Sequence, residues 1–214
     1  MLKKELLKKQ GLYLVTDRNA LKGKDLLKIL PDSVRAGLDM VQFRDKEAND
    51  TDFLEAAAKI KDLLKEKQVL FIINDRIDIA LAMDADGVHL GREDVPVEVA
   101  RRILGRRKII GFSAHSLEEA LIAAEKNVDY IAIGAIFPTP VKPDYGTPGL
   151  EALKQAVKQI KIPLVAIGGI NESNIGDVAA TGVKRIAVVR AILEAKDPYL
   201  ATKFLLDKIG NGNG

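Results

Sequence analysis

The chain has 214 residues, 47% of them hydrophobic, and a formal net charge of only +3. This length and composition suffice for one well-packed core, and so small a positive surplus is not the basic patch of a nucleic-acid-binding protein. The absence of cysteine excludes disulfides and thiolate chemistry. No apolar run is long enough to span a membrane, and the N-terminus has no signal-peptide core. We therefore expect a cytoplasmic protein that binds neither nucleic acid nor a membrane.

Short apolar runs alternate with amphipathic stretches along the whole chain. The predicted strands are residues 12–16, 40–44, 70–74, 87–90, 109–113, 130–134, 164–167 and 186–189. Apolar positions at i, i+3 and i+4 predict helices, most clearly over 53–65, 117–126, 150–160 and 198–209. Thr51 is expected to start the second helix, and Ser116 with Glu119 has the pattern of a capping box. Eight strands in strict alternation with helices predict an α/β fold, a single-domain (β/α)8 TIM barrel over residues 1–209 with a disordered tail at 210–214. A doubly wound open sheet is the alternative.

The active site of such a barrel lies at the C-terminal ends of its strands, and polar residues follow nearly every predicted strand. After the second strand, Gln42, Arg44 and Lys46 alternate with Phe43 and Asp45, so the first three share one face. An amide, a guanidinium and an ammonium on one face form a row of donors that suits a pyrophosphate. A solvated edge strand would show the same alternation.

Two carboxylates lie on adjacent strands of the predicted barrel. Asp75 follows the third strand and Asp94 lies in the loop after the fourth, an arrangement that can hold Mg²⁺ while leaving positions for phosphate oxygens. The alternative is that both are helix N-caps; beside the row of donors we favour the metal. Gly168 and Gly169 end the seventh strand, before a helix that Asn171 could cap, and predict a phosphate site.

The longest predicted loop covers residues 134–149, and its length predicts a binding loop or lid. In it, Thr139 and Lys142 could contact a second phosphate. The chain has two histidines. We expect His89, within a buried strand, to be a core residue, whereas His115, just past the fifth strand, could act as a general acid or base near neutral pH.

These residues form six motifs in chain order: Gln-x-Arg-x-Lys (42–46), Asn-Asp-Arg (74–76), Gly-Val-His-Leu-Gly-x-x-Asp (87–94), Gly-x-Ser-x-His (111–115), Phe-Pro-Thr-x-x-Lys (137–142) and Ile-Gly-Gly-Ile (167–170). Together they resemble the thiamine phosphate synthase family over roughly residues 12–192. The resemblance implies an enzyme, a transferase that moves an aminomethylpyrimidine group from hydroxymethylpyrimidine diphosphate to a thiazole phosphate and releases pyrophosphate. It also implies Mg²⁺ as cofactor, a pyrimidine carbocation as intermediate and small-molecule substrates as the partners.

Carried over position by position, the resemblance implies a role for each motif residue. Gln42, Arg44, Lys46 and Asn74 would hold the pyrimidine diphosphate, with Phe43 and Asp45 in the same segment. Asp75 and Asp94 would bind Mg²⁺. Ser113 and Lys142 would contact the pyrophosphate or the pyrimidine. The thiazole phosphate would be held by Thr139, Pro140, Val141, Gly169, Val189 and Arg190. The residues implied to act in catalysis are Arg44, Lys46, Ser113 and Lys142.

The sequence departs from the family pattern at four positions. Val141 replaces a threonine, Arg190 a serine, Arg92 a glutamine and Ala135 a proline, so the thiazole half of the site is the altered half. Two alternatives remain. One is a thiazole tautomerase with His115 as the proton shuttle, which the retained Asp75 and Asp94 oppose. The other is a non-catalytic paralogue that binds a phosphorylated ligand. A homo-oligomer is compatible with a barrel of this size.

Overall fold

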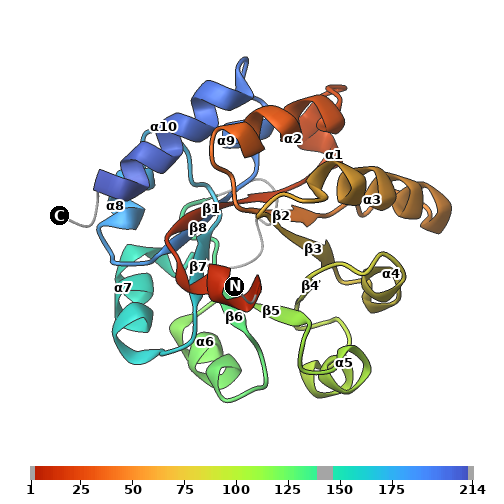
Figure 1. Cartoon of the computed structure of the whole chain (residues 1–214). Helices are drawn as coiled ribbons and strands as arrows, with labels where there is room; N and C mark the ends of the chain where they lie inside the picture. The colour runs from red at the N-terminus through yellow and green to blue at the C-terminus, as the bar shows by residue number, and fades with distance from the viewer. Residues whose placement is uncertain (1–2, 139–146, 212–214) are drawn as a thin grey trace.

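The computed structural model describes residues 3–138 and 147–211. Within these residues eight parallel strands pair in chain order and close into a barrel, which confirms the predicted TIM-barrel fold and excludes the open sheet (Figure 1). The strands are β1 (Gly11–Val15), β2 (Met40–Phe43), β3 (Leu70–Asn74), β4 (Gly87–Leu90), β5 (Ile109–Ala114), β6 (Tyr130–Ile133), β7 (Leu164–Ile167) and β8 (Arg185–Val188).

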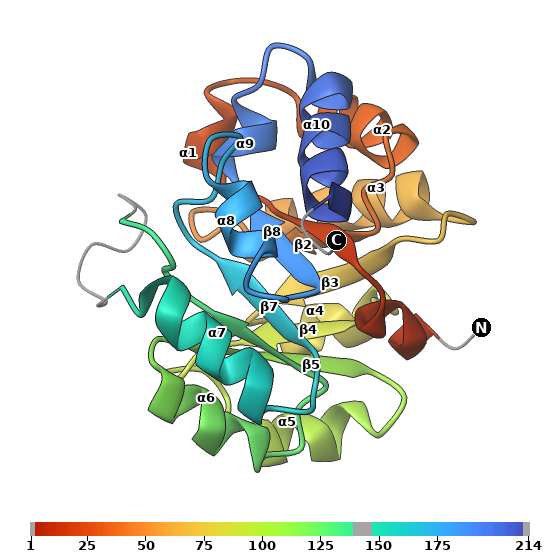
Figure 2. The ribbon, with the colours of Figure 1, turned by 90° about the vertical axis from the view of Figure 1, so that its left-hand side faces the viewer.

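Helices form the outer ring of the barrel, and Figure 2 shows α7, α8 and α10 outside the strands. The helices are η1 (Lys3–Lys8, a 3-10 helix), α1 (Arg18–Leu21), α2 (Leu26–Arg35), α3 (Asp50–Leu64), α4 (Ile77–Ala82), α5 (Val97–Leu104), α6 (Leu117–Ala124), α7 (Gly149–Gln159), α8 (Ile175–Ala179), α9 (Arg190–Leu193) and α10 (Pro198–Asn211). Helix α10 includes residues 210 and 211, two residues past the predicted end of the barrel. No helix in the described part of the chain is long and apolar enough to cross a membrane.

One predicted helix start is confirmed and one is wrong. The Ser116 hydroxyl accepts from the backbone N–H of Glu119, and the Glu119 carboxylate accepts from the backbone N–H of His115, so the capping box forms before α6. Helix α3 instead begins at Asp50, because the Asn49 side chain accepts from the backbone N–H of Asp52. Thr51 therefore lies inside the first turn and does not start the helix.

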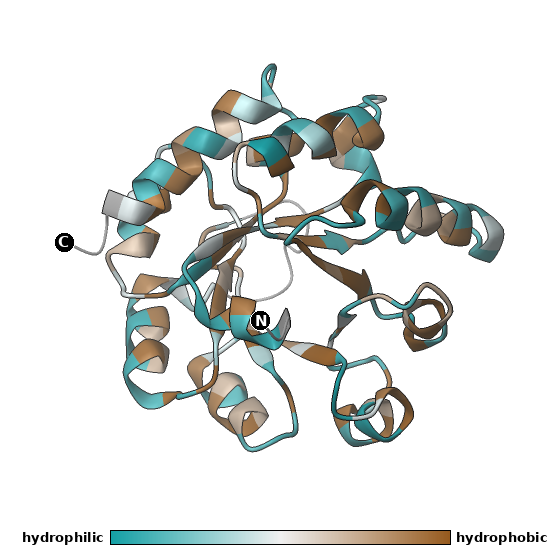
Figure 3. Cartoon of the chain, in the orientation of Figure 1, coloured by the Kyte–Doolittle hydropathy of each residue, from teal (hydrophilic) through white to brown (hydrophobic). Residues whose placement is uncertain are grey.

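Alternation along each strand divides the apolar core into two layers. On β1, Leu12 and Leu14 belong to the layer between the barrel and the helices, whereas Tyr13 and Val15 belong to the barrel interior. The brown strands and the partly teal helices of Figure 3 reflect the same division between buried and solvent-facing positions. Residues of η1 also enter the inner layer, so this short helix covers the N-terminal end of the barrel (Figure 1). The opposite end is left for a site.

Candidate active site

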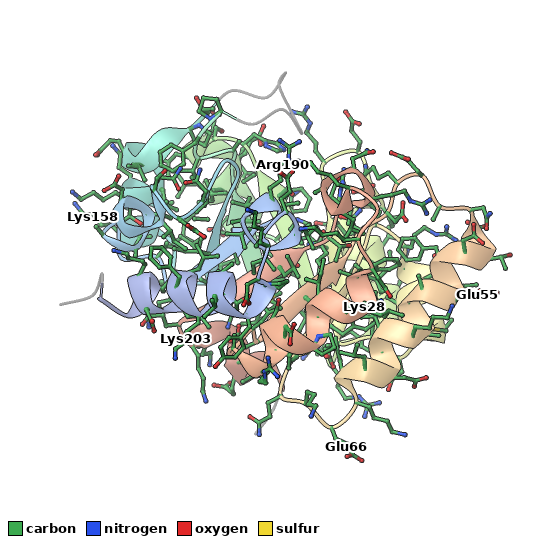
Figure 4. The ribbon with its side chains drawn as sticks, turned by 90° about the horizontal axis from the view of Figure 1, so that it is seen from above. Lys28, Glu55, Glu66, Lys158, Arg190 and Lys203 are labelled. Carbon is green, nitrogen blue, oxygen red and sulfur yellow. The ribbon has the colours of Figure 1, made fainter. Side chains whose placement is uncertain are left out.

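A cavity of about 350 Å³ occupies the C-terminal end of the barrel. Its lining includes seven of the predicted site residues and both histidines: Gln42, Arg44, Asn74, His89, Ser113, His115, Gly169, Val189 and Arg190. Figure 4 shows Arg190 and Glu66 at opposite ends of the molecule, because Arg190 follows β8 and Glu66 precedes β3. Parallel strands thus bring these separate motifs to one end of the barrel, as the sequence predicted.

Arg44 is fixed by two residues that follow β1 and that sequence reasoning missed. The Thr16 hydroxyl accepts from the Arg44 backbone N–H (2.8 Å) and donates to the Arg44 carbonyl oxygen (3.0 Å). One Asp17 carboxylate oxygen accepts from Arg44 Nη1 at 2.8 Å, and the other caps α1 by accepting from the Ala20 N–H. A Thr-Asp pair directly after the first strand was the available signal. The guanidinium is therefore held in place, with its charge balanced by Asp17.

Of the other residues in segment 42–46, Gln42 lines the cavity, whereas Phe43, Asp45 and Lys46 do not. Lys46 lies beyond the end of β2, where its Nζ is 3.5 Å from Asp75 Oδ2. Phe43 packs in the outer layer against Phe53, with 4.5 Å between ring centroids, so its side chain does not face the cavity. The Asp45 carboxylate pairs with Arg18 at 2.7 Å, which lowers its pKa although burial opposes this. Neither side chain lines the cavity, so the predicted place of Phe43 and Asp45 in the substrate-binding segment stays a prediction.

Asp75 directly follows β3 and interacts with Asp94, which lies in the loop after β4. Burial first, and then the neighbouring Asp94 carboxylate, raise the pKa of Asp75 above its ordinary value, while Lys46 opposes the shift. Asp94 Oδ2 also accepts from the Gly91 N–H at 2.6 Å. Neither aspartate is a helix N-cap, since Arg76 and Pro96 occupy those positions before α4 and α5, so that alternative is wrong.

The carboxylate pair fits a divalent cation. Two adjacent acidic groups that resist joint ionisation are stabilised by a hard cation with oxygen ligands. Asp75 also has a φ of 60°, a conformation that few non-glycine residues adopt and that marks functional positions in many proteins. Among the described residues no cluster of three acidic, histidine or cysteine side chains forms. A metal here would therefore take most of its ligands from substrate and water.

The two histidines both contribute to the cavity wall. His89 is buried, as predicted, but its role is not confined to the core: its Nε2 is 2.9 Å from Ser113 Oγ and its Nδ1 is 2.9 Å from Tyr130 Oη. His115 Nδ1 lies 2.8 Å from the Gly134 carbonyl oxygen. A carbonyl oxygen only accepts, so this ring nitrogen of His115 carries the proton. Ser113 is thus linked to a histidine that sequence reasoning had set aside.

The glycines after β7 allow a close contact between two chain segments. Gly168 and Gly169 have φ values of 103° and 68°, and a Cβ at Gly168 would lie 2.5 Å from the Ala135 Cα. The backbone N–H of Phe137 donates to the Gly168 carbonyl oxygen at 3.0 Å. The expected cap at Asn171 is wrong, because α8 begins at Ile175 and the Asn171 side chain accepts from the N–H of Ser173.

The thiazole half of the predicted site is only partly described. Val189 and Arg190 line the cavity at the start of α9, and Arg190 Nε is 3.5 Å from a Glu194 carboxylate oxygen. The Arg190 side chain is 48% exposed. The other predicted contacts in this half, Thr139, Pro140, Val141 and Lys142, lie outside the described residues.

Comparison with known proteins shows which family the chain belongs to. The model of the family described as thiamine monophosphate synthase matches residues 12–192. Thiamine-phosphate synthase from Clostridium acetobutylicum is 49% identical over 185 residues, 86% of this chain and 88% of that protein. The Clostridium tetani enzyme of the same name is 45% identical over 186 residues, 87% of this chain and 89% of that protein. A solved structure named thiamine phosphate pyrophosphorylase, from Pyrococcus furiosus, covers 98% of this chain and all of its own with 41% identity and a TM-score of 0.89. The chain therefore belongs to the thiamine monophosphate synthase family of transferases, as its motifs indicated.

Proposed function

We propose that the chain joins the aminomethylpyrimidine group of hydroxymethylpyrimidine diphosphate to a thiazole phosphate with the help of Mg²⁺, giving thiamine phosphate and pyrophosphate. The observation that carries this proposal is the contact between Asp75 and Asp94, with Lys46 3.5 Å from Asp75. Asp75 directly follows Asn74, which lines the cavity. This group is suited to hold a metal-bound diphosphate at the mouth of a cavity that takes the pyrimidine.

Counting charges supports the need for a metal. Arg44 is balanced by Asp17, whereas Lys46 faces Asp75 and Asp94, so these five groups have a net charge of −1 when both aspartates are ionised (two positive and three negative groups). A diphosphate anion would be repelled by such a group. One divalent cation changes the sum to +1, and when bound it would act as a Lewis acid on the diphosphate oxygens.

The reaction needs stabilisation of charge more than a protein nucleophile. Breaking the bond between the pyrimidine methylene carbon and the diphosphate oxygen leaves a carbocation and places the electron pair on pyrophosphate. Fixed donors therefore bind the transition state more strongly than the ground state. In this proposal Arg44 is oriented by Thr16 and Asp17, and Lys46 and Ser113 supply further donors. The thiazole nitrogen then attacks the methylene carbon.

Apolar walls would protect the cation from water. The lining includes Val15, Ala132, Ile167, Ala187 and Val188. These side chains offer no nucleophile and limit the number of water molecules near the carbocation. Gly169 and Arg190 would take the thiazole phosphate, with the guanidinium of Arg190 in place of the serine hydroxyl usual in the family.

The test is an endpoint assay with purified protein, Mg²⁺, hydroxymethylpyrimidine diphosphate and thiazole phosphate. Equal amounts of pyrophosphate and thiamine phosphate, both lost with EDTA, are expected. Asp75→Asn and Asp94→Asn should raise the Mg²⁺ requirement and lower turnover, whereas Asp207→Asn, an exposed position on α10, should change neither. Absence of product from a folded protein would refute the proposal and lead to the tautomerase assay with a His115 variant.

A further inference from the structure

We propose that a buried chain of hydrogen bonds from Gln42 through Tyr13, Tyr130 and His89 to Ser113 acts as a one-directional positioning relay, which turns the Ser113 hydroxyl into a donor toward the cavity. Tyr13, Tyr130 and His89 are its positioning residues. The idea rests on the proposed function for the ligand that Ser113 would meet, an anionic diphosphate oxygen.

The relay crosses the barrel interior in four bonds. Gln42 Nε2 donates to Tyr13 Oη at 2.6 Å, and Tyr13 Oη is 2.9 Å from Tyr130 Oη. His89 then joins Tyr130 Oη to Ser113 Oγ through its two ring nitrogens, each at 2.9 Å. Both ends line the cavity, whereas Tyr130 is fully buried and outside the lining.

The direction of donation follows from counting protons. Each phenol has one proton, and burial raises the pKa of both phenols so that they stay protonated. Tyr13 Oη already accepts from Gln42, so its proton goes to Tyr130 Oη. The Tyr130 proton then goes to His89 Nδ1.

His89 sets the direction of the last hydrogen bond, the one to Ser113. With Nδ1 accepting, the proton of the neutral imidazole is on Nε2, and Nε2–H donates to Ser113 Oγ. The Ser113 proton is then left to donate to another group, and Ser113 lines the cavity. At the other end the Gln42 carbonyl oxygen is left to accept. The relay thus presents an acceptor at one side of the cavity and a donor at the other.

The barrel makes room for the relay at Gly111. This residue pairs with Tyr130 between β5 and β6, and a Cβ there would lie 2.3 Å from Tyr130 Oη. The Tyr130 ring stacks on His89, with 5.5 Å between centroids, and meets Tyr13 edge-on at 6.1 Å. The glycine of the Gly-x-Ser-x-His motif therefore serves to place a tyrosine from the next strand.

The first test reads the protonated nitrogen of His89 in the unmodified protein. Long-range ¹H–¹⁵N spectra of ¹⁵N-histidine protein distinguish the two neutral forms, and with only two histidines a His115→Gln variant assigns the signals. The expected result at neutral pH is His89 with its proton on Nε2. A proton on Nδ1 alone would overturn the relay, since Ser113 would then donate to His89 Nε2. Protons on both nitrogens would also overturn it, since His89 would then donate to Tyr130 as well as to Ser113. This measurement needs no substrate, so it stands even if synthase activity is absent.

The second test removes single hydroxyl groups. Tyr130→Phe takes away the donor to His89, so the histidine should become a mixture of both neutral forms. We expect kcat to fall about 2- to 10-fold, the effect of one hydrogen bond, with little change in KM. Tyr13→Phe leaves Tyr130 free to donate to His89 and should keep the Nε2–H form.

Matched controls separate positioning from general damage. Tyr199→Phe, at a ring that packs under the Arg35 guanidinium at 4.8 Å, should leave the His89 spectrum and kcat unchanged. Binding of Mg²⁺-pyrophosphate, measured by calorimetry, should weaken in Ser113→Ala and, less strongly, in Tyr130→Phe. The proposal would be overturned by a folded Tyr130→Phe variant that keeps the kcat of the unmodified protein and the His89 proton on Nε2.

Discussion

The buried ion pair between Arg185 and Asp39 allows a quantitative stability prediction. Arg185 begins β8 and is 1% exposed, and its guanidinium donates to both Asp39 carboxylate oxygens at 2.6 and 2.9 Å. Its Nη2 also donates to the Leu6 carbonyl oxygen at 2.7 Å, which ties η1 to the barrel. Gly11 gives the pair room, since a Cβ there would lie 2.4 Å from an Asp39 oxygen. The pair therefore closes the end of the barrel opposite to the cavity.

Removing one partner should cost far more than removing both. Asp39→Ala leaves a buried guanidinium without its counter-charge, which costs about 3–5 kcal/mol in comparable pairs. For a domain of this size each kcal/mol lowers Tm by about 2–4 °C, so the variant should lose roughly 6–20 °C. Replacing Arg185 by Met as well removes the unpaired charge and should recover most of the loss.

Urea unfolding of the two single variants and the double variant measures this coupling. Asp32→Ala is the matched control, because Asp32 pairs with Arg35 at 3.0 Å on the exposed surface of α2 and should contribute at most about 1 kcal/mol. Turnover of folded Asp39→Ala should persist, since the pair is remote from the cavity. Additive effects of Asp39→Ala and Arg185→Met, or a loss no larger than that of Asp32→Ala, would refute the reasoning.

Three further changes have clear expected outcomes. Ser116→Ala removes the N-cap of α6 and should lower the free energy of unfolding by about 1 kcal/mol, measured by urea midpoint. Gly168→Ala forces a Cβ against Ala135 at a positive φ and should reduce both Tm and thiazole phosphate affinity; an unchanged Tm would contradict this. Because burial and Asp94 raise the pKa of Asp75, its ionised form destabilises the fold. Asp75→Asn should therefore raise the unfolding free energy at pH 7 in EDTA, with the gain vanishing below about pH 4, where the carboxyl is protonated in both states.

The barrel itself was predictable because its signals are local. Each strand is a short apolar run that ends at polar or glycine residues, and β3, β4 and β7 have the predicted bounds. Parallel strands place their C-terminal ends together, so the motif residues that follow them converge without further information. Local signals failed where several residues of one kind compete, as at Asn49 and Thr51, either of which can cap a helix.

Contacts that depend on barrel closure were not predictable. Arg185 and Asp39 are 146 residues apart, and Tyr13 and Tyr130 are 117 apart. Nothing in the local sequence of either tyrosine indicates that the other provides its partner. The role of His89 was missed for the same reason: its strand identifies it as buried, but only the closed barrel shows that it contacts Ser113.

The balance of charge at the cavity leads to a last prediction, that metal-free pyrophosphate binding is limited by Asp17. The predicted row of donors suits a pyrophosphate, but Asp17 balances Arg44, and Asp75 with Asp94 outweighs Lys46. Asp17→Asn removes one negative charge, and asparagine is as good an N-cap as aspartate, so α1 should be retained. In EDTA this variant should bind pyrophosphate more tightly than the unmodified protein does, whereas with Mg²⁺ it should lower kcat because Arg44 loses its anchor. Equal or weaker pyrophosphate binding in EDTA would contradict this prediction. It would mean that Asp17 matters for pyrophosphate binding by holding Arg44 in place and not by its negative charge.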